Sequence, residues 1–170
     1  ALIFVSTETD QEMTYTYRQL HAEVQRMAAS LLSLGVKKGD RVLIYMPMIA
    51  EASFAMLACA RIGAIHSVVF GGFASGSLAT RIEDASPKVI VSADAGSRGG
   101  KVVEYKPLLD EAIRLSAHKP DAVLLVDRGL AKMEMTEGRD ALWSHLREKH
   151  LNNVVPVSYT HLTLPTTPYV

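Results

Sequence analysis

The sequence predicts an α/β fold in which a doubly wound parallel sheet carries helices on both faces. Short apolar runs alternate with helical patterns over residues 42–126, as expected for consecutive βαβ units. The runs are apolar throughout rather than alternating with polar residues, which is typical of parallel strands covered on both faces. A chain of 170 residues has the length of one domain with its own core.

The first predicted element is an amphipathic helix with both of its ends marked. Thr16 followed by Gln19 matches a capping box, apolar residues then recur at three- and four-residue spacing, and Gly35 follows the last turn. The next apolar run, residues 42–46, is short and ends at Pro47, so it suits a buried strand. Pro47 can open the following helix, because proline is favoured in a first helical turn.

The same alternation of helix and strand continues to residue 126. The expected elements are a helix over 48–62 ending at Gly63, a strand over 64–70, a helix over 78–85, a strand over 89–92, a helix over 108–117 and a strand over 123–126. The end of the chain differs, because no Asp, Glu, Lys or Arg follows Lys149 and the last residues are rich in Thr and Pro. We expect residues 158–170 to be disordered.

Composition argues against several classes of function. The 18 basic residues equal the 18 acidic residues, whereas nucleic-acid-binding proteins usually carry a basic excess. The sequence contains no run of about 18 apolar residues, so we expect no membrane span. The single Cys59 lies in an apolar run, so we expect a small core residue in a reducing compartment rather than a catalytic thiolate. His66 is likewise expected to be a core residue without a catalytic role.

Two glycine-rich segments follow predicted strands, at the edge where open α/β sheets bind ligands. In the first, VVFGGFASGS, Gly71 and Gly72 let a ligand approach the backbone closely. This segment does not match the G-x-G-x-x-G pattern of dinucleotide-binding proteins, since Phe73 occupies a position that requires glycine. A tight strand-to-helix turn that binds no ligand explains the same residues.

The second segment, SADAGSRGGKVVEY, places Arg98 and Lys101 on either side of Gly99 and Gly100. Two cations on a flexible backbone suit a phosphate, for which Arg offers a planar fork of donors and Lys a mobile point charge. The segment is not a Walker A loop, because Val102 stands where that loop has Ser or Thr. The alternative is a solvated surface loop with incidental charge.

Three longer stretches together carry a family resemblance. They are GDRVLIYMPMIAEASFAMLACARIGAIHSVVFGGFASGSLATRI, PKVIVSADAGSRGGKVVEYKPLLDEAI and AVLLVDRGL. They resemble the acetyl- and propionyl-CoA synthetase branch of the adenylate-forming superfamily, and GGFASGSLATRI and LLVDRGLAKM are more similar to its propionyl-CoA members. The resemblance implies that residues 1–157 form part of the large N-terminal synthetase/ligase domain. Residues 158–170 resemble translated adapter sequence, and we expect a non-native tail there.

The resemblance implies a two-step reaction and a coenzyme site. A short-chain carboxylate such as propionate attacks the α-phosphate of ATP, with the help of Mg²⁺, to give an acyl-adenylate and pyrophosphate. The CoA thiol then displaces AMP, and the resemblance implies that the intact enzyme is cytoplasmic. By the same resemblance, the segment with Arg98, Gly99, Gly100 and Lys101 holds the phosphorylated nucleotide end of CoA. Lys101 stands where acetyl-CoA members carry a second Arg, so the charge is kept without the fork. Phe70, Gly71 and Gly72 match the family segment that lines the same pocket.

Other family motifs do not occur in the sequence. The phosphate loop ending in Lys-Pro-Lys-Gly, the Tyr-Gly-x-Thr-Glu segment and the adenylation lysine are absent. We therefore expect a fragment without turnover, because the groups that stabilise the reacting phosphate are missing. The alternatives are a fragment of an acetyl-CoA synthetase, a non-catalytic module that binds the CoA phosphate, and a piece that does not fold stably alone.

Overall fold

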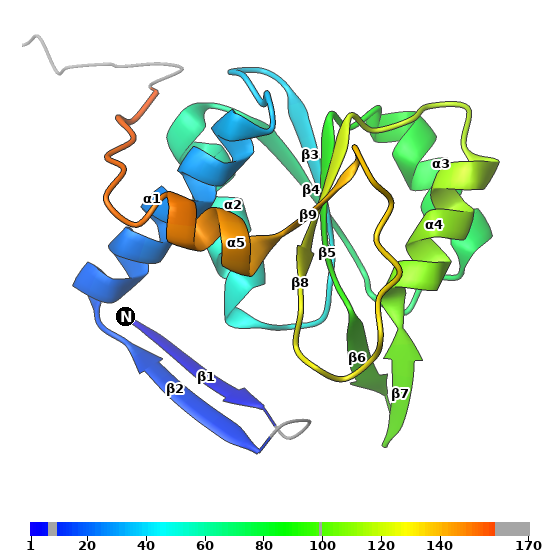
Figure 1. Cartoon of the computed structure of the whole chain (residues 1–170), viewed down its shortest axis with the longest axis horizontal. Helices are drawn as coiled ribbons and strands as arrows, with labels where there is room; N and C mark the ends of the chain where they lie inside the picture. The colour runs from blue at the N-terminus through cyan, green and yellow to red at the C-terminus, as the bar shows by residue number, and fades with distance from the viewer. Residues whose placement is uncertain (7–9, 99, 159–170) are drawn as a thin grey trace, which may run out of the picture.

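A five-stranded parallel sheet forms the centre of the structure, a computed structural model that describes residues 1–6, 10–98 and 100–158 (Figure 1). Every pair of neighbouring strands in this sheet is parallel, which confirms the predicted α/β class. In spatial order the strands are β4 (Ile65–Val69), β3 (Arg41–Tyr45), β5 (Val89–Ala93), β8 (Ala122–Val126) and β9 (Asp140–Leu142).

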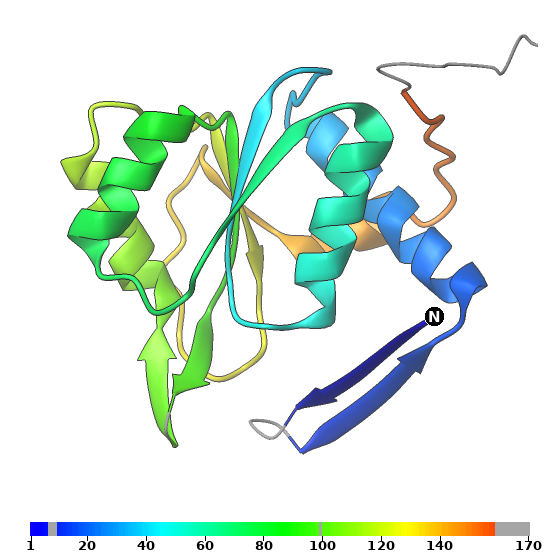
Figure 2. The same cartoon turned by 180° about the vertical axis from the view of Figure 1, so that it is seen from behind.

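Helices cover both faces of the sheet, as the sequence predicts. Figures 1 and 2 show α1 (Tyr17–Ser33), α2 (Ala50–Ile62) and α5 (Trp143–Lys149) on one face. The other face carries α3 (Ser75–Ala85) and α4 (Tyr105–Leu115). The sheet is therefore the middle of three layers.

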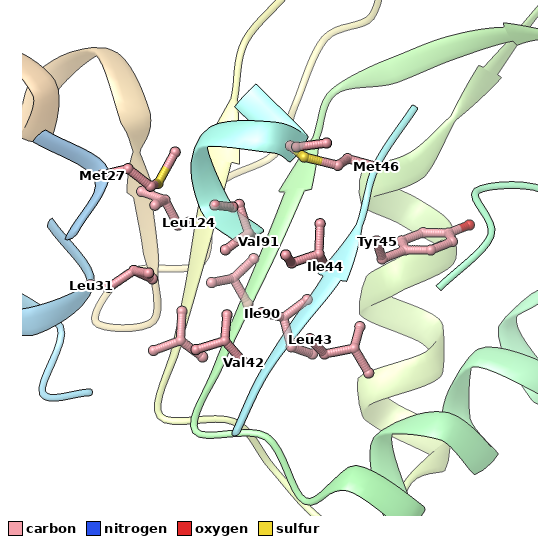
Figure 3. Close-up of a cluster of buried hydrophobic side chains, with 14 of the residues drawn as sticks. Met27, Leu31, Val42, Leu43, Ile44, Tyr45, Met46, Ile90, Val91 and Leu124 are labelled. Carbon is pink, nitrogen blue, oxygen red and sulfur yellow. The ribbon is translucent and has the colours of Figure 1, made fainter. Parts of the chain in front are cut away.

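The core is centred on β3, where residues 42–45 are fully buried. Leu43 and Tyr45 point to one side of the strand, whereas Ile44 points to the other, toward the side on which Met27 of α1 lies (Figure 3). This alternation lets one strand supply both apolar interfaces. Each such aliphatic side chain stabilises the fold by about 1.5–3 kcal/mol relative to leaving it exposed.

The residues predicted to begin and end the helices do so in most cases. Thr16 caps α1 through a capping box, in which Gln19 N donates to Thr16 Oγ1 at 3.2 Å and Thr16 N donates to Gln19 Oε1 at 2.8 Å. Gly63 ends α2 with a φ of 74°, a left-handed conformation that favours glycine. However, α2 begins at Ala50 rather than at Pro47, because Pro47 O accepts the N–H of Ile49 in a turn that precedes the helix.

Five strands and one helix are missing from the sequence prediction. β1 (Leu2–Ser6) and β2 (Gln11–Tyr15) form an antiparallel hairpin, β6 (Ala95–Arg98) and β7 (Lys101–Glu104) form a second one, and β9 and α5 follow residue 126. The β6–β7 hairpin occupies the segment expected to be a flexible loop. Its register pairs Arg98 with Lys101, so the connection between the two strands has the length of the shortest hairpin loops.

Two predictions about β4 are wrong. The strand lies at the edge of the sheet, and Ile65 and Val68 are 57% and 55% exposed, so it is not covered on both faces. His66 is also exposed rather than buried in the core. An apolar run predicts a strand, but the position of that strand in the sheet depends on pairing with distant residues.

The expectation that Cys59 is a core residue is confirmed. The side chain is fully buried in α2, and burial raises the pKa of its thiol to about 12. The expected tail over residues 158–170 lies outside the described residues except for Ser158, whose N–H donates to Arg61 O at 2.7 Å. Within the described residues, no helix has the length and apolar character needed to cross a membrane.

A buried ion-pair network joins α4 to β9. Lys106 Nζ lies 3.0 Å from Asp140 Oδ2 and 2.5 Å from Asp110 Oδ2, and Arg139 Nε donates to Asp140 Oδ1 at 2.6 Å. Burial raises the pKa of Asp140, but hydrogen bonds from Arg139, from the Thr136 N–H and from Lys106 outweigh this effect and keep the pKa below its ordinary value. The network therefore stabilises the charged carboxylate.

We predict that K106M lowers the free energy of unfolding by about 3 kcal/mol, because it removes one partner of a buried pair. The side chain of Lys106 is only 2% exposed and that of Asp140 is 0% exposed. Urea unfolding at pH 7 measures the change. The matched control is R114M, which breaks the exposed pair with Glu111 and should leave the unfolding midpoint unchanged. Equal midpoints for K106M and R114M would contradict a stabilising network.

Candidate functional site

The order of the strands creates a reversal point between β3 and β5. The chain passes from β3 outward to β4 and then returns across β3 to form β5. Ligands in open parallel sheets bind at such a point, beyond the C-terminal ends of the strands. Both predicted glycine-rich segments leave the sheet at this end, and the second of them forms the projecting β6–β7 hairpin (Figure 1).

A groove of ≈ 740 Å³ lies beside the reversal point. Its wall includes residues 46–48 after β3, residues 68–74 around the end of β4, and the base of the β6–β7 hairpin with the start of α4. Two smaller hollows lie on the α2 side of the sheet, near the β1–β2 hairpin, and neither glycine-rich segment lines them. The large groove is therefore the one that joins the two predicted segments.

The first glycine-rich segment turns sharply at the rim of the groove. Phe70 is 64% exposed, and its ring meets that of Phe73 edge to face with centroids 6.0 Å apart. The N–H of Phe73 donates to Phe70 O at 3.2 Å, which closes the turn. Gly71 lies against Tyr105, since a Cβ on Gly71 would overlap the tyrosine hydroxyl and lie 2.8 Å from Cζ. Glycine is needed here for space rather than for a positive φ.

The second segment reaches the groove with its base and extends beyond it with its tip. Ser97 and Val103 from the two strands line the groove, whereas Gly100 and Lys101 are exposed at the turn. Gly100 has a φ of 77°, a conformation that favours glycine. Gly99 and the side chain of Arg98 lie outside the described part of the chain.

Two tyrosines that the sequence patterns do not mark lie at and behind the groove wall: Tyr105 lines the groove, and the buried Tyr45 packs against it. The rings of Tyr45 and Tyr105 have centroids 5.0 Å apart, and Tyr45 Oη donates to Phe73 O at 3.1 Å. Burial, assisted by the neighbouring Tyr105, raises the pKa of Tyr45 to about 12, so this hydroxyl keeps its proton at neutral pH. No local sequence signal marks either tyrosine, because their importance comes from contacts between residues far apart in the chain.

Asp94 joins, through hydrogen bonds, several segments that meet near the groove. It is fully buried directly after β5, and its Oδ2 accepts the N–H groups of Leu130 at 2.7 Å and Ala131 at 3.2 Å. Its backbone oxygen accepts the N–H of Tyr105 at 2.9 Å. The residue thus joins the end of β5, the loop after β8 and the start of α4. Among the described residues, no group of three or more His, Cys, Asp or Glu side chains is placed to hold a metal ion.

Comparison with known proteins identifies a family and several relatives. The sequence profile described as AMP-binding enzyme matches residues 1–160. The chain is 65% identical over 159 residues to a propionate–CoA ligase of Salmonella typhimurium, which covers 94% of this chain and 25% of the relative. It is 48% identical over 163 residues to the mitochondrial acyl-CoA synthetase short-chain family member 3 of Rattus norvegicus, covering 95% of this chain and 24% of the relative.

A solved structure shares the fold. The acetoacetyl-CoA synthetase from Streptomyces lividans superposes with a TM-score of 0.76 at 28% identity, over 89% of this chain and 22% of that one. The chain therefore spans about a quarter of the length of the curated relatives that it matches.

We predict that G71A lowers the free energy of unfolding by about 1–3 kcal/mol, because the added methyl group overpacks against the Tyr105 ring. Thermal or urea unfolding measures the loss. The matched control is G76A in α3, where a Cβ would meet nothing within 4 Å and a helical Gly-to-Ala change should be neutral or stabilising by up to about 1 kcal/mol. If G71A were as stable as G76A, the close fit of Gly71 to Tyr105 would be wrong.

Proposed function

We propose, on the premise that this chain belongs to the AMP-binding enzyme family, that its parent protein is an acid:CoA ligase acting on propionate or another short-chain acid. The parent forms an acyl-adenylate and pyrophosphate from the acid and ATP, and the CoA thiol then displaces AMP to give the acyl-CoA. Propionate is favoured over acetate because the relatives at 65% and 64% identity are both named propionate–CoA ligase.

Within this reaction, we assign CoA binding to the present chain. The observation that carries this assignment is the groove at the reversal point, which joins Phe70, Gly71 and Gly72 to the hairpin that bears Arg98, Gly99, Gly100 and Lys101. An exposed Lys at a hairpin tip is suited to a phosphate of a large ligand, whose remaining parts can lie in the less polar groove. Lys101 supplies a point charge rather than a bidentate fork.

ATP and Mg²⁺ are cofactors of the proposed parent enzyme, and no described residue of this chain is assigned to either. The main catalytic need is stabilisation of charge on the transferring phosphoryl group. The groove residues are mostly apolar and offer no cluster of donors for that purpose. This chain therefore contributes coenzyme binding rather than turnover. A cytoplasmic parent agrees with a single, buried cysteine, and small molecules rather than nucleic acid or membranes are its proposed partners.

We predict that the chain binds CoA more tightly than dephospho-CoA, by about tenfold, because the extra phosphate adds charge-assisted hydrogen bonds at the hairpin tip. Isothermal titration with each ligand measures the ratio. K101A should bring the ratio close to one, whereas K149A, an exposed Lys on α5 across the sheet, should leave it unchanged. Equal affinities for the two ligands in the unmodified chain would show that the hairpin tip does not bind the extra phosphate of CoA.

We also predict that the chain releases no pyrophosphate from ATP in the presence of propionate, Mg²⁺ and CoA. A coupled pyrophosphate assay should give the signal of a protein-free control. ATP- and propionate-dependent release above that control would show that these residues form a complete phosphoryl-transfer site and would overturn the assignment of a purely coenzyme-binding role.

A further inference from the structure

Tyr105 lies between the two segments that form the proposed CoA site. It is the first residue of α4 and directly follows β7, and it is only 7% exposed. Its N–H donates to Asp94 O at 2.9 Å, which holds its backbone at the C-terminal end of β5. The residue therefore belongs to the hairpin side of the groove while its ring reaches the other side.

The ring fits between two glycines, one from each segment. A Cβ on Gly71 would overlap the Tyr105 hydroxyl, and a Cβ on Gly96 of β6 would lie 2.9 Å from the same oxygen. Contacts this short exclude any side chain at either position without movement of the ring. The distance between the turn at Gly71 and the hairpin is thus set by the width of one tyrosine.

Tyr45 supports this ring from the sheet. The two rings are tilted by 37° with centroids 5.0 Å apart, and Tyr45 Oη is hydrogen-bonded to Phe73 O. Tyr45 is itself fully buried in β3, and Figure 3 shows its side chain leaving the strand on the side opposite Ile44. A continuous path of contacts therefore leads from the hairpin through Tyr105 and Tyr45 to the turn that holds Phe70.

We propose that Tyr105 is a positioning residue for coenzyme binding, which fixes the separation between the Phe70–Gly72 turn and the β6–β7 hairpin so that both contact one CoA molecule. The inference rests on the proposed function, since it concerns the same groove. Its physical basis is preorganisation: a ligand that bridges two segments binds more tightly when their spacing is set before it arrives. Without the ring, both segments should still be present, but their spacing should no longer allow both to contact one ligand.

The test compares Y105L with Y105F and with F54L. Phe54 is an equally buried aromatic residue on α2, on the opposite face of the sheet, so F54L controls for a general loss of packing. We expect Y105L to weaken CoA binding at least tenfold in a titration of folded protein, with Y105F within about threefold of the unmodified chain because the ring is kept. F54L should lower the melting temperature without changing the CoA affinity.

A second measurement does not depend on CoA. Hydrogen exchange at the Phe73 amide, which donates to Phe70 O, should become faster in Y105L but not in F54L. G71A provides an independent variant if Y105L does not fold, because its methyl group displaces the retained ring and should weaken CoA binding in the same way. In the G71A/Y105L double variant, the combined loss should be smaller than the sum of the single losses.

The outcomes separate this inference from the proposed function. CoA affinity and Phe73 exchange that are both unchanged in Y105L would overturn the positioning role of Tyr105. If the unmodified chain itself does not bind CoA, the proposed function of the groove fails. The exchange rates then decide the inference alone: faster exchange in Y105L supports the positioning of the turn, and unchanged exchange overturns it.

Discussion

The burial of β3 is the constraint on which the rest of the structure depends. Residues 42–45 are fully buried, and the strand pairs with β4 on one side and β5 on the other. A strand in this position must be covered on both faces, and the two helical layers meet that requirement. Because the chain leaves β3 toward one edge and returns to the other side, the same strand also creates the reversal point in the strand order.

The groove is a consequence of this arrangement. Parallel strands end at one edge of the sheet, so segments that are distant in sequence emerge close together there. The turn after β4 and the hairpin after β5 would still be separate features without a side chain between them. Tyr105 occupies that position, and the absence of side chains at Gly71 and Gly96 allows it to do so. The glycines thus make room for a protein side chain.

The buried charged residues of the fold differ in their surroundings from the exposed Lys101. The buried charges of Lys106 and Asp140 are paired and hydrogen-bonded, which fixes α4 against β9. Asp94, also buried, uses its carboxylate to hold backbone N–H groups of the loop after β8. Lys101, in contrast, lies at an exposed hairpin tip, where a cation remains hydrated until a ligand approaches. The charges that stabilise the fold are therefore distinct from the one that we propose binds a ligand.

Local sequence patterns determined the α/β class, the parallel sheet, the capped helix from Thr16 and the two glycine-rich segments. Each of these depends on residues close together in the chain, through helical periodicity, apolar runs and turn chemistry. The family of the chain was equally readable from its sequence. Only the tertiary structure decided that β4 lies at an edge with His66 exposed, that the second segment is a hairpin, and that Tyr105 separates it from Gly71. These features depend on which distant residues come into contact, and no local pattern contains that information.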